Sequence, residues 1–270
     1  MIDQHENDDI EWSIVTVTFN NEKTLRRWMQ PPCSPNVEHI VVDNASGDNT
    51  VSTAEELGAT KVISLSKNVG FSAANNIGFQ SARGRYVAFV NPDVAVDFKT
   101  LDRLRETIDC SGGLVAPQLL NEDGTMQPNA RGLPYLSSKI FGRVSNNHAK
   151  RSNYYRYAAA DEVVQIPWVI GAAVCGKREI FEQLGAWDSR FFLYYEDADL
   201  CLRAGQAGLP VSVDGAVHWT HEWKRATTNF KWSPWKNEIK SAARFYSRYP
   251  DLVFPMGFRR PLRRDPVARV

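Results

Sequence analysis

The chain has 270 residues, of which 43% are hydrophobic and 23% charged, and its formal net charge is +1. This length is enough for one large α/β domain, and the near-neutral charge provides no broad basic face for nucleic acid. The four cysteines form no CxxC pair, which argues against a zinc ribbon or a redox dithiol. We expect reduced thiols in a cytoplasmic protein, because residues 1–11 are acidic and polar and no apolar run reaches the roughly 18 residues that span a bilayer.

Strand and helix signals alternate over about residues 12–112. Runs of β-branched and apolar residues predict four strands, at 13–18, 39–42, 62–65 and 86–90. Helices are predicted over 22–30, over 72–83 with Ser72 as the N-cap, and after Asp97, where apolar residues recur at helical spacing. This alternation predicts an α/β fold with a largely parallel sheet and flanking helices.

The regular alternation ends near Gly112. Beyond it, a helix is predicted over 178–184 and closed by Gly185, and another lies near the C-terminus. The apolar face expected for this last helix carries Trp235, Ile239, Ala242 or Ala243, and Tyr246. No low-complexity linker divides the chain, so we interpret residues 1–270 as one domain.

Four successive strands are followed by polar residues. These strand ends are Thr18-Phe19-Asn20, Asp43-Asn44, Asn68-Val69-Gly70 and Asn91-Pro92-Asp93. In an open parallel sheet the carboxyl ends of the strands form one rim, where ligands bind. The chain lacks both GxGxxG and a phosphate loop ending in Gly-Lys-Ser/Thr, which disfavours a nicotinamide dehydrogenase or a phosphate-loop NTPase. Carboxylates and amides at strand ends instead suit a nucleoside and a hydrated divalent ion.

An acidic cluster, Glu196-Asp197-Ala198-Asp199, occupies a predicted helix start. The helix dipole stabilises negative charge in the first turn, which would keep a carboxylate ionised and available as a base. The alternative is an ordinary acidic helix start, since acids also gather there for structural reasons. The preceding aromatic residues, which could stack on an acceptor, are Phe191, Phe192, Tyr194 and Tyr195.

Two histidines, His218 and His221, stand three residues apart. Imidazoles in such a pair could supply a metal ligand or contact a phosphate. The alternative is that both are surface or packing histidines.

Taken in order, these stretches resemble the family 2 glycosyltransferases with a GT-A fold, and within them bacterial rhamnosyltransferases that act on lipid-linked cell-envelope glycans. The ordered set extends from about residue 12 to about residue 225 and is specific, although each stretch is short. The matching stretches are 15–20, 41–48, 68–71, 89–93, 168–172, 185–188 and 196–199. The resemblance implies a Rossmann-like, mostly parallel sheet. Its implied parts are a nucleotide-sugar-binding half over about 12–112, an acceptor-binding and catalytic half over about 113–250, and a basic tail over 251–270.

The resemblance assigns the donor to the strand ends. Thr18 and Asp43 would contact the nucleoside, with the Asp43 carboxylate accepting from the pyrimidine ring N–H. Asn68 and Gly70 would approach the nucleotide, although Gly70 could equally mark a turn. The full donor-binding set implied is Thr18, Asn20, Asp43, Asn68, Gly70, Asn91 and Asp93.

Asn91-Pro92-Asp93 occupies the place of the Asp-x-Asp metal motif of the family. Asp93 remains the natural ligand for Mg²⁺ or Mn²⁺, and His218 or His221 would add a ligand once the donor binds. The amide at the first position removes one carboxylate, which leaves open whether the site requires metal.

The family pattern places the catalytic base on Asp197, and Glu196 would orient the acceptor. Asp199 would support the helix start. Trp168 and Gly171 lie where the acceptor should pass, although Trp168 could equally belong to the core. The implied reaction is a single displacement with inversion, in which Asp197 removes the acceptor hydroxyl proton while a metal ion balances charge on the departing diphosphate.

For the substrates, the resemblance favours dTDP-rhamnose as donor and a glycan or polyprenyl-linked acceptor in cell-envelope polysaccharide synthesis. The stretch 129–134 also resembles those rhamnosyltransferases. The alternatives are a UDP-sugar donor on the same fold, and a non-catalytic module that binds a sugar nucleotide or a glycan. The retained Asp197 and both histidines argue against a non-catalytic module.

The C-terminal segment mixes aromatic and basic side chains. They are Phe254, Met256, Phe258, Arg259, Arg260, Leu262, Arg263 and Arg264. Basic residues next to anionic lipid predict a reversible peripheral contact with the inner face of the plasma membrane. A disordered, solvated tail is the alternative.

Overall fold

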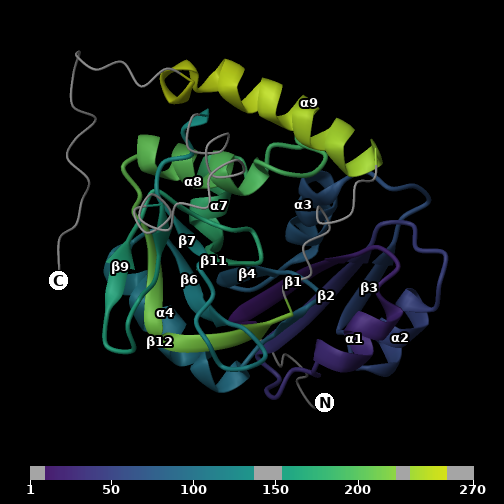
Figure 1. Ribbon diagram of the computed structural model, residues 1–270. Coiled ribbons are helices and arrows are strands. Elements are labelled where there is room, and N and C mark those ends of the chain that lie inside the picture. The colour runs from purple at the N-terminus through teal and green to yellow at the C-terminus, as the bar shows by residue number, and fades with distance from the viewer. Residues whose placement is uncertain (1–9, 137–153, 223–231, 254–270) are drawn as a thin grey trace, which may run out of the picture.

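The computed structural model describes residues 10–136, 154–222 and 232–253, with the side chains of the last helix described from Lys236 onward. Within these ranges the chain forms a nine-stranded sheet with helices on both faces and a separate three-stranded sheet (Figure 1). The strands of the large sheet are β1 (Trp12–Thr18), β2 (Val37–Asp43), β3 (Lys61–Ser64), β4 (Tyr86–Val90), β5 (Val94–Ala95), β6 (Leu114–Leu120), β9 (Val163–Gln165), β11 (Ala173–Lys177) and β12 (Val211–His221). The small sheet contains β7 (Ala130–Arg131), β8 (Tyr155–Arg156) and β10 (Trp168–Val169).

The large sheet is mixed, with order β3-β2-β1-β4-β11-β6-β12-β5, and β9 pairs with β12. The first four strands are parallel, as their alternation with helices predicts. β11 then runs antiparallel between β4 and β6, and β12 is parallel to β6. Strands from both predicted halves therefore share one sheet, and the expected α/β architecture is confirmed.

Seven α-helices are described, together with two 3₁₀ turns, η1 (Phe98–Thr100) and η2 (Pro250–Leu252). The helices are α1 (Glu22–Trp28), α2 (Thr50–Glu56), α3 (Phe71–Ser81), α4 (Leu101–Ser111), α7 (Arg178–Leu184), α8 (Glu196–Gln206) and α9 (Trp232–Arg248). The predicted helix over 178–184 is confirmed, and Gly185 closes it with φ 70°. Asp97 caps η1 by accepting from Lys99 N at 3.1 Å.

Side-chain alternation along the strands builds a core on each face of the sheet. In β1, Val15 packs on the face of α3, α7 and α8, whereas its neighbour Ile14 packs on the face of α4. Successive side chains of a strand point to opposite faces, so a strand buried on both sides reads as a continuous apolar run. In Figure 1, α3, α7, α8 and α9 lie above the sheet and α1, α2 and α4 below it.

Two expectations about the helices are wrong in part, and one helix was not predicted. Gly70, and not Ser72, is the N-cap of α3, because the chain turns with a positive φ before the helix begins. Ile239, expected on the apolar face of α9, is 64% exposed, whereas Tyr246, also expected there, is buried beside Ser241, Phe245 and Tyr249. The sequence did not predict α2, whose buried side chains are small and partly polar and so give no apolar period.

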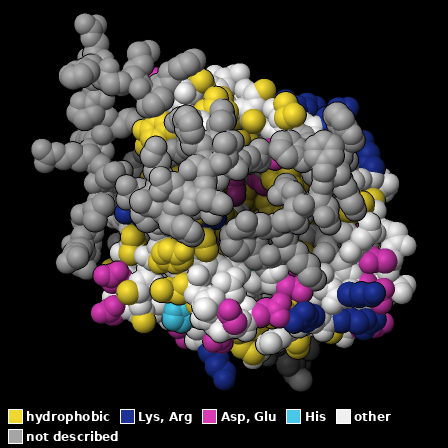
Figure 2. Space-filling model, in the orientation of Figure 1, with side chains coloured by type: hydrophobic (Ala, Val, Ile, Leu, Met, Phe, Trp, Pro, Cys, Tyr) yellow, Lys and Arg dark blue, Asp and Glu magenta, His cyan; other side chains and the backbone are white. Residues whose placement is uncertain are grey.

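Ion pairs join the outer helices on the lower side. Arg26 of α1 pairs with Glu56 of α2 at 3.0 Å, and Arg27 pairs with Glu122 at 2.6 Å. In the view of Figure 2, basic and acidic side chains alternate over α1 and α2. Such exposed pairs contribute about 0–1 kcal/mol each, so the apolar layers and not these pairs hold the helices in place.

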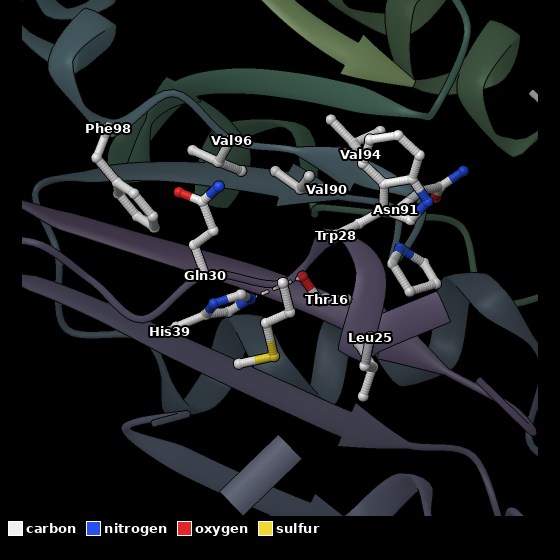
Figure 3. A pocket seen from close by; sticks show the side chains of 12 residues that line it. Thr16, Leu25, Trp28, Gln30, His39, Val90, Asn91, Val94, Val96 and Phe98 are labelled. Atoms are coloured by element: carbon white, nitrogen blue, oxygen red, sulfur yellow. Dashed lines mark hydrogen bonds between the residues drawn. The ribbon is translucent and has the colours of Figure 1, made fainter. Parts of the chain in front are cut away.

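A small pocket lies beneath the strand ends, between α1 and the sheet (Figure 3). The His39 ring of β2 points into it, and Nε2 lies 3.0 Å from Thr16 Oγ1, while no partner is described for Nδ1. The remaining lining is mainly apolar, including Leu25, Met29 and Val96. Burial among these groups lowers the pKa of His39 from 6.5 to about 4, so the imidazole is neutral at pH 7.

This shift predicts a pH dependence of folding. Between pH 6.5 and about 4 the unfolded chain protonates His39 while the folded protein does not, so this contribution is complete above pH 6.5 and is lost on acidification. From pH 7.5 to pH 5, wild type should lose about 2 kcal/mol more unfolding free energy than His39→Gln, as measured by urea denaturation. Parallel pH profiles of the two proteins would contradict this account of His39.

Candidate active site

The ends of β1 and β2 are joined by a buried carboxylate. Thr18 and Asp43 are register partners, and Thr18 Oγ1 donates to Asp43 Oδ1 at 3.0 Å. Asp43 also accepts from the Ser46 hydroxyl, and its Oδ2 accepts from Ser46 N at 2.8 Å. Asp43 is 1% exposed. The two predicted nucleoside residues therefore meet, and protein donors already occupy much of the carboxylate.

Asn20 connects the loops that follow these strands. It has φ 55°, its N donates to Ser46 Oγ at 2.7 Å, and its Oδ1 accepts from Gly47 N at 2.8 Å. Asparagine tolerates this left-handed backbone better than most residues. Asn20 thus shapes the exposed surface of the rim, next to Phe19, which is 48% exposed.

The loop before α3 is tied to the loop before α8. Asn68 Oδ1 accepts from Gly70 N at 3.0 Å, and Gly70 has φ 89°. A Cβ on Gly70 would lie 2.7 Å from Phe192 Cδ2, and Phe71 N donates to Phe192 O at 2.7 Å. Both the turn and the close approach require glycine, and the neighbour that comes close is Phe192.

Asp93 and His221 meet at the end of β4 and β12. Asp93 Oδ1 lies 3.4 Å from His221 Nε2, and Glu222 N donates to Asp93 O at 3.0 Å. The antiparallel pairing of β5 with β12 sets this contact, because it aligns Val94 with His221. Two of the predicted metal ligands therefore come together.

A neighbouring amide fixes the tautomer of His221. Gln127 Nε2 donates to the backbone O of His221 at 2.6 Å, which turns Gln127 Oε1 toward His221 Nδ1 at 2.8 Å. Nδ1 must then carry the hydrogen, so when the ring is neutral its Nε2 lone pair faces the Asp93 carboxylate. Two electron-pair donors that face each other are typical of a metal-binding pair when a hydrogen bond from a further residue, here Gln127, orients one of them.

These two side chains would supply only part of a coordination sphere. Among the described residues, no group of three or more His, Cys, Asp or Glu side chains could hold a metal ion. Mg²⁺ is often held by one or two protein ligands, with water and substrate phosphates completing the sphere. Asp93 and His221 fit a divalent ion that is shared with a phosphate ligand.

His218 is not part of this pair. It is exposed on β12, whereas His221 is buried. Residues an odd number apart on a strand point to opposite faces of the sheet. The spacing of three residues therefore directs His218 and His221 to opposite faces of β12.

Asp197 lies in the first turn of α8 and contacts the chain next to β10. Its Oδ2 accepts from Gly171 N at 3.0 Å and its Oδ1 from Ala198 N at 2.8 Å. A Cβ on Gly171 would lie 3.3 Å from Asp197 Cβ, so a larger residue would crowd this contact. The two N–H donors fix the orientation of the carboxylate at the start of α8. The structure thus brings the predicted base and Gly171 together.

The backbone before α8 adopts a costly conformation. Tyr194 and Tyr195 have φ 71° and 70° in succession, although neither is glycine. Such residues cost about 1–3 kcal/mol each and persist where the surrounding structure holds them. Tyr195 packs on Phe245 with ring centroids 5.1 Å apart, and Phe191 is fully buried. Of the aromatic residues expected to face an acceptor, these two belong to the core.

The neighbouring acids have different environments. Asp199 is fully buried and accepts from Arg203 Nε at 2.8 Å, Arg248 Nη1 at 2.6 Å and Tyr249 OH at 3.0 Å. It therefore joins α8 to α9, a larger structural role than support of the helix start. Glu196 is 6% exposed at the helix start.

Trp168 is buried in β10 at 5% exposure. Its Nε1 donates to Gly132 O at 2.8 Å, and Tyr154 packs on it edge-on with centroids 6.5 Å apart. This burial favours the core alternative for most of the indole surface.

A short backbone path joins the Asp93 loop to Asp197. Asn91 N donates to Ala172 O at 2.9 Å, and the preceding residue Gly171 binds Asp197. The arrangement therefore puts a candidate metal pair, the Asp197 carboxylate and the rim of β1 and β2 on one side of the sheet. Sequence reasoning missed Gln127, which lies outside every strand-end motif and acts only through His221.

Two solved structures resemble this fold. The chain aligns with GalNAc-T7, crystallised with UDP, GalNAc and Mn²⁺, at a TM-score of 0.61 and 18% identity over 90% of this chain. It aligns with S. aureus TarS 1-349 in complex with UDP-GlcNAc at a TM-score of 0.55 and 18% identity over 90% of this chain. The chain spans 51% and 65% of those two chains. The expected GT-A fold is confirmed.

Sequence relatives point the same way. The "Glycosyl transferase family 2" model matches residues 13–185, which is more than half of the chain. An N-acetylglucosaminyl-diphospho-decaprenol L-rhamnosyltransferase of Mycobacterium tuberculosis is 24% identical over 72% of this chain and 70% of its own length. Rhamnosyltransferase WbbL of Escherichia coli is 26% identical over 66% of this chain and 70% of its own length. The chain belongs to glycosyl transferase family 2, and the prediction that it is a glycosyltransferase is confirmed.

The described helices include none that is both long and apolar enough to cross a bilayer. The segment 254–264, for which we expect a membrane contact, lies outside the described residues.

The buried site of Asp199 predicts that its substitution destabilises the folded protein. Asp199→Asn removes the charge from a buried site with three donors, and it should lower the unfolding free energy by about 2–4 kcal/mol. Asp102→Asn is the matched control, since its side chain is 78% exposed, and it should change stability by less than about 0.5 kcal/mol. Equal stability of the two variants in urea denaturation would show that Asp199 does not hold α8 to α9.

Proposed function

We propose that this glycosyltransferase moves rhamnose from dTDP-rhamnose to a hydroxyl group of a diphosphate-linked sugar acceptor, with inversion at the anomeric carbon. The observation that carries the proposal is the short link from the Asp93–His221 pair through Asn91 and Ala172 to Asp197. It provides one position for a diphosphate leaving group and another for a base within a single continuous site.

In this mechanism Asp197 is the general base. Gly171 N and Ala198 N donate to its carboxylate. The carboxylate would accept the proton of the acceptor hydroxyl as its oxygen attacks. The two N–H donors hold the carboxylate orientation, so the base needs no rearrangement before reaction.

Asp93 and His221 would hold Mg²⁺ or Mn²⁺ together with the donor. A divalent ion supplies positive charge for the departing diphosphate. Gln127 would keep His221 in the tautomer that presents its Nε2 lone pair. The rim of Thr18, Asn20 and Asp43 would receive the nucleoside, with the open face of this rim formed by the Asn20 loop.

The names of the sequence relatives support the choice of substrates. Two of them are rhamnosyltransferases, and one is named for an acceptor that joins N-acetylglucosamine to decaprenol through a diphosphate. A lipid-linked acceptor of this class, in cell-envelope polysaccharide synthesis, would bring the protein to a membrane surface.

A thermal-shift screen of dTDP-, UDP- and GDP-sugars with Mn²⁺ tests the donor. A ligand that binds only the folded state raises the melting temperature, and dTDP-rhamnose should give the largest shift. The screen needs no knowledge of the acceptor. A larger shift with a UDP-sugar would identify that sugar nucleotide as the donor in place of dTDP-rhamnose. The absence of a shift with every nucleotide sugar would refute the proposal.

The same screen identifies the metal ligands. Asp93→Ala and His221→Gln should abolish the Mn²⁺-dependent part of the nucleotide shift, because each removes one of the paired ligands. His218→Gln is the matched control and should retain it. Loss in His218→Gln with retention in His221→Gln would reverse the assignment.

Replacing the base should separate rate from binding. Asp197→Asn keeps the shape of the side chain but removes its basicity, so turnover should fall roughly a hundredfold or more. Nucleotide affinity, measured by calorimetry on the same protein, should stay within about twofold, since the base acts on the acceptor.

Glu196→Gln is the comparison variant for this experiment. If Asp197→Asn keeps turnover within about threefold of wild type while Glu196→Gln is inactive, the base is Glu196. Asp199→Asn serves less well, because its expected instability would lower activity without any role in catalysis.

A further inference from the structure

Three side chains form a row across the small sheet. Trp168 of β10 is the register partner of Arg131 of β7, and Arg131 is the partner of Tyr155 of β8. Directly opposed residues of antiparallel strands project from the same face. The Arg131 guanidinium lies 4.6 Å from the centroid of the Tyr155 ring. The row therefore holds a cation between two aromatic residues.

Arg131 is buried with little compensation. It is 6% exposed, and its described hydrogen bond runs from Nη1 to Ala130 O at a long 3.3 Å. Within the described ranges it forms no ion pair with a carboxylate. Burying a guanidinium costs several kcal/mol unless it is paired, and an arginine stays protonated in proteins. A buried, oriented guanidinium with unused donors is suited to an anionic ligand.

The row lies on the Asp197 side of the molecule. Gly171, three residues beyond Trp168, donates to Asp197, so Trp168 is within roughly 10 Å of chain from that contact. β10 also packs against α8. Burial lowers the pKa of Arg131, while the neighbouring Tyr154, Tyr155 and Asp197 raise it.

We propose that Arg131 binds a phosphate of the diphosphate group that links the acceptor sugar to its carrier. This inference rests on the proposed function only for the identity of the acceptor. The donor diphosphate has its own position at Asp93 and His221, whereas Arg131 shares a sheet with Trp168, beside the base. Its planar fork matches two phosphate oxygens, and Tyr155 holds the plane of the fork.

Calorimetry with geranyl diphosphate tests this site directly. The titration is done with the nucleotide site saturated by dTDP and Mn²⁺, so that the probe can enter only a second diphosphate site. Arg131→Gln should weaken geranyl diphosphate binding about tenfold or more, because a charged hydrogen-bonded partner is lost. Arg156→Gln, an exposed arginine of the same small sheet, should bind like wild type.

The outcomes separate this proposal from the proposed function. Equal geranyl diphosphate affinity in wild type and Arg131→Gln would overturn it, even if the protein transfers rhamnose. A loss of dTDP affinity in Arg131→Gln without a second diphosphate site would assign the guanidinium to the donor and also overturn it. If Arg131→Gln does not fold, Arg131→Lys keeps the charge but not the fork, and it should bind the probe about threefold to tenfold more weakly.

Discussion

The antiparallel pairing of β11 with β4 is the constraint on which the site depends. It aligns Ala173 with Val90, so the residues just beyond the pair, Ala172 and Asn91, form the next backbone hydrogen bond. Gly171 then lies beside the loop of Asp93 and presents its N–H to Asp197. A slip of one residue would turn each side chain of β11 to the other face and break this connection. The two halves of the chain therefore meet in register, and the proposed active site lies where they meet.

Polar groups at the rim are held by each other before any ligand binds. Asp43 accepts from Thr18 and Ser46, and Asn20 orders the following loop. A site whose donors and acceptors are already fixed loses less entropy when it orders a ligand. The left-handed residues Tyr194 and Tyr195 fit the same pattern, because the packing of Tyr195 on Phe245 stabilises a backbone that would otherwise be unfavourable.

The two aspartates of α8 have similar side chains but different surroundings. Asp197 and Asp199 are two residues apart, yet only Asp199 is enclosed by two guanidinium groups and a phenol. These donors connect Asp199 to α9, so its role is structural. Asp197 accepts from the backbone N–H groups of Gly171 and Ala198. The same logic separates Arg248, paired with Asp188 and Asp199, from Arg131, which no described carboxylate pairs.

The sequence alone determined the parallel strands, the helix over 178–184, the start of α8 and the polar strand ends, because each depends on local periodicity or on a short motif. It also indicated the family, since the motifs follow one order along the chain. Only the tertiary structure decided between His218 and His221, which depends on strand pairing with β5. It also decided the antiparallel course of β11, the burial of Asp199 by α9, and the row of Trp168, Arg131 and Tyr155. These features depend on contacts between residues far apart in the chain, and local sequence patterns contain no information about which distant strand or helix becomes the neighbour.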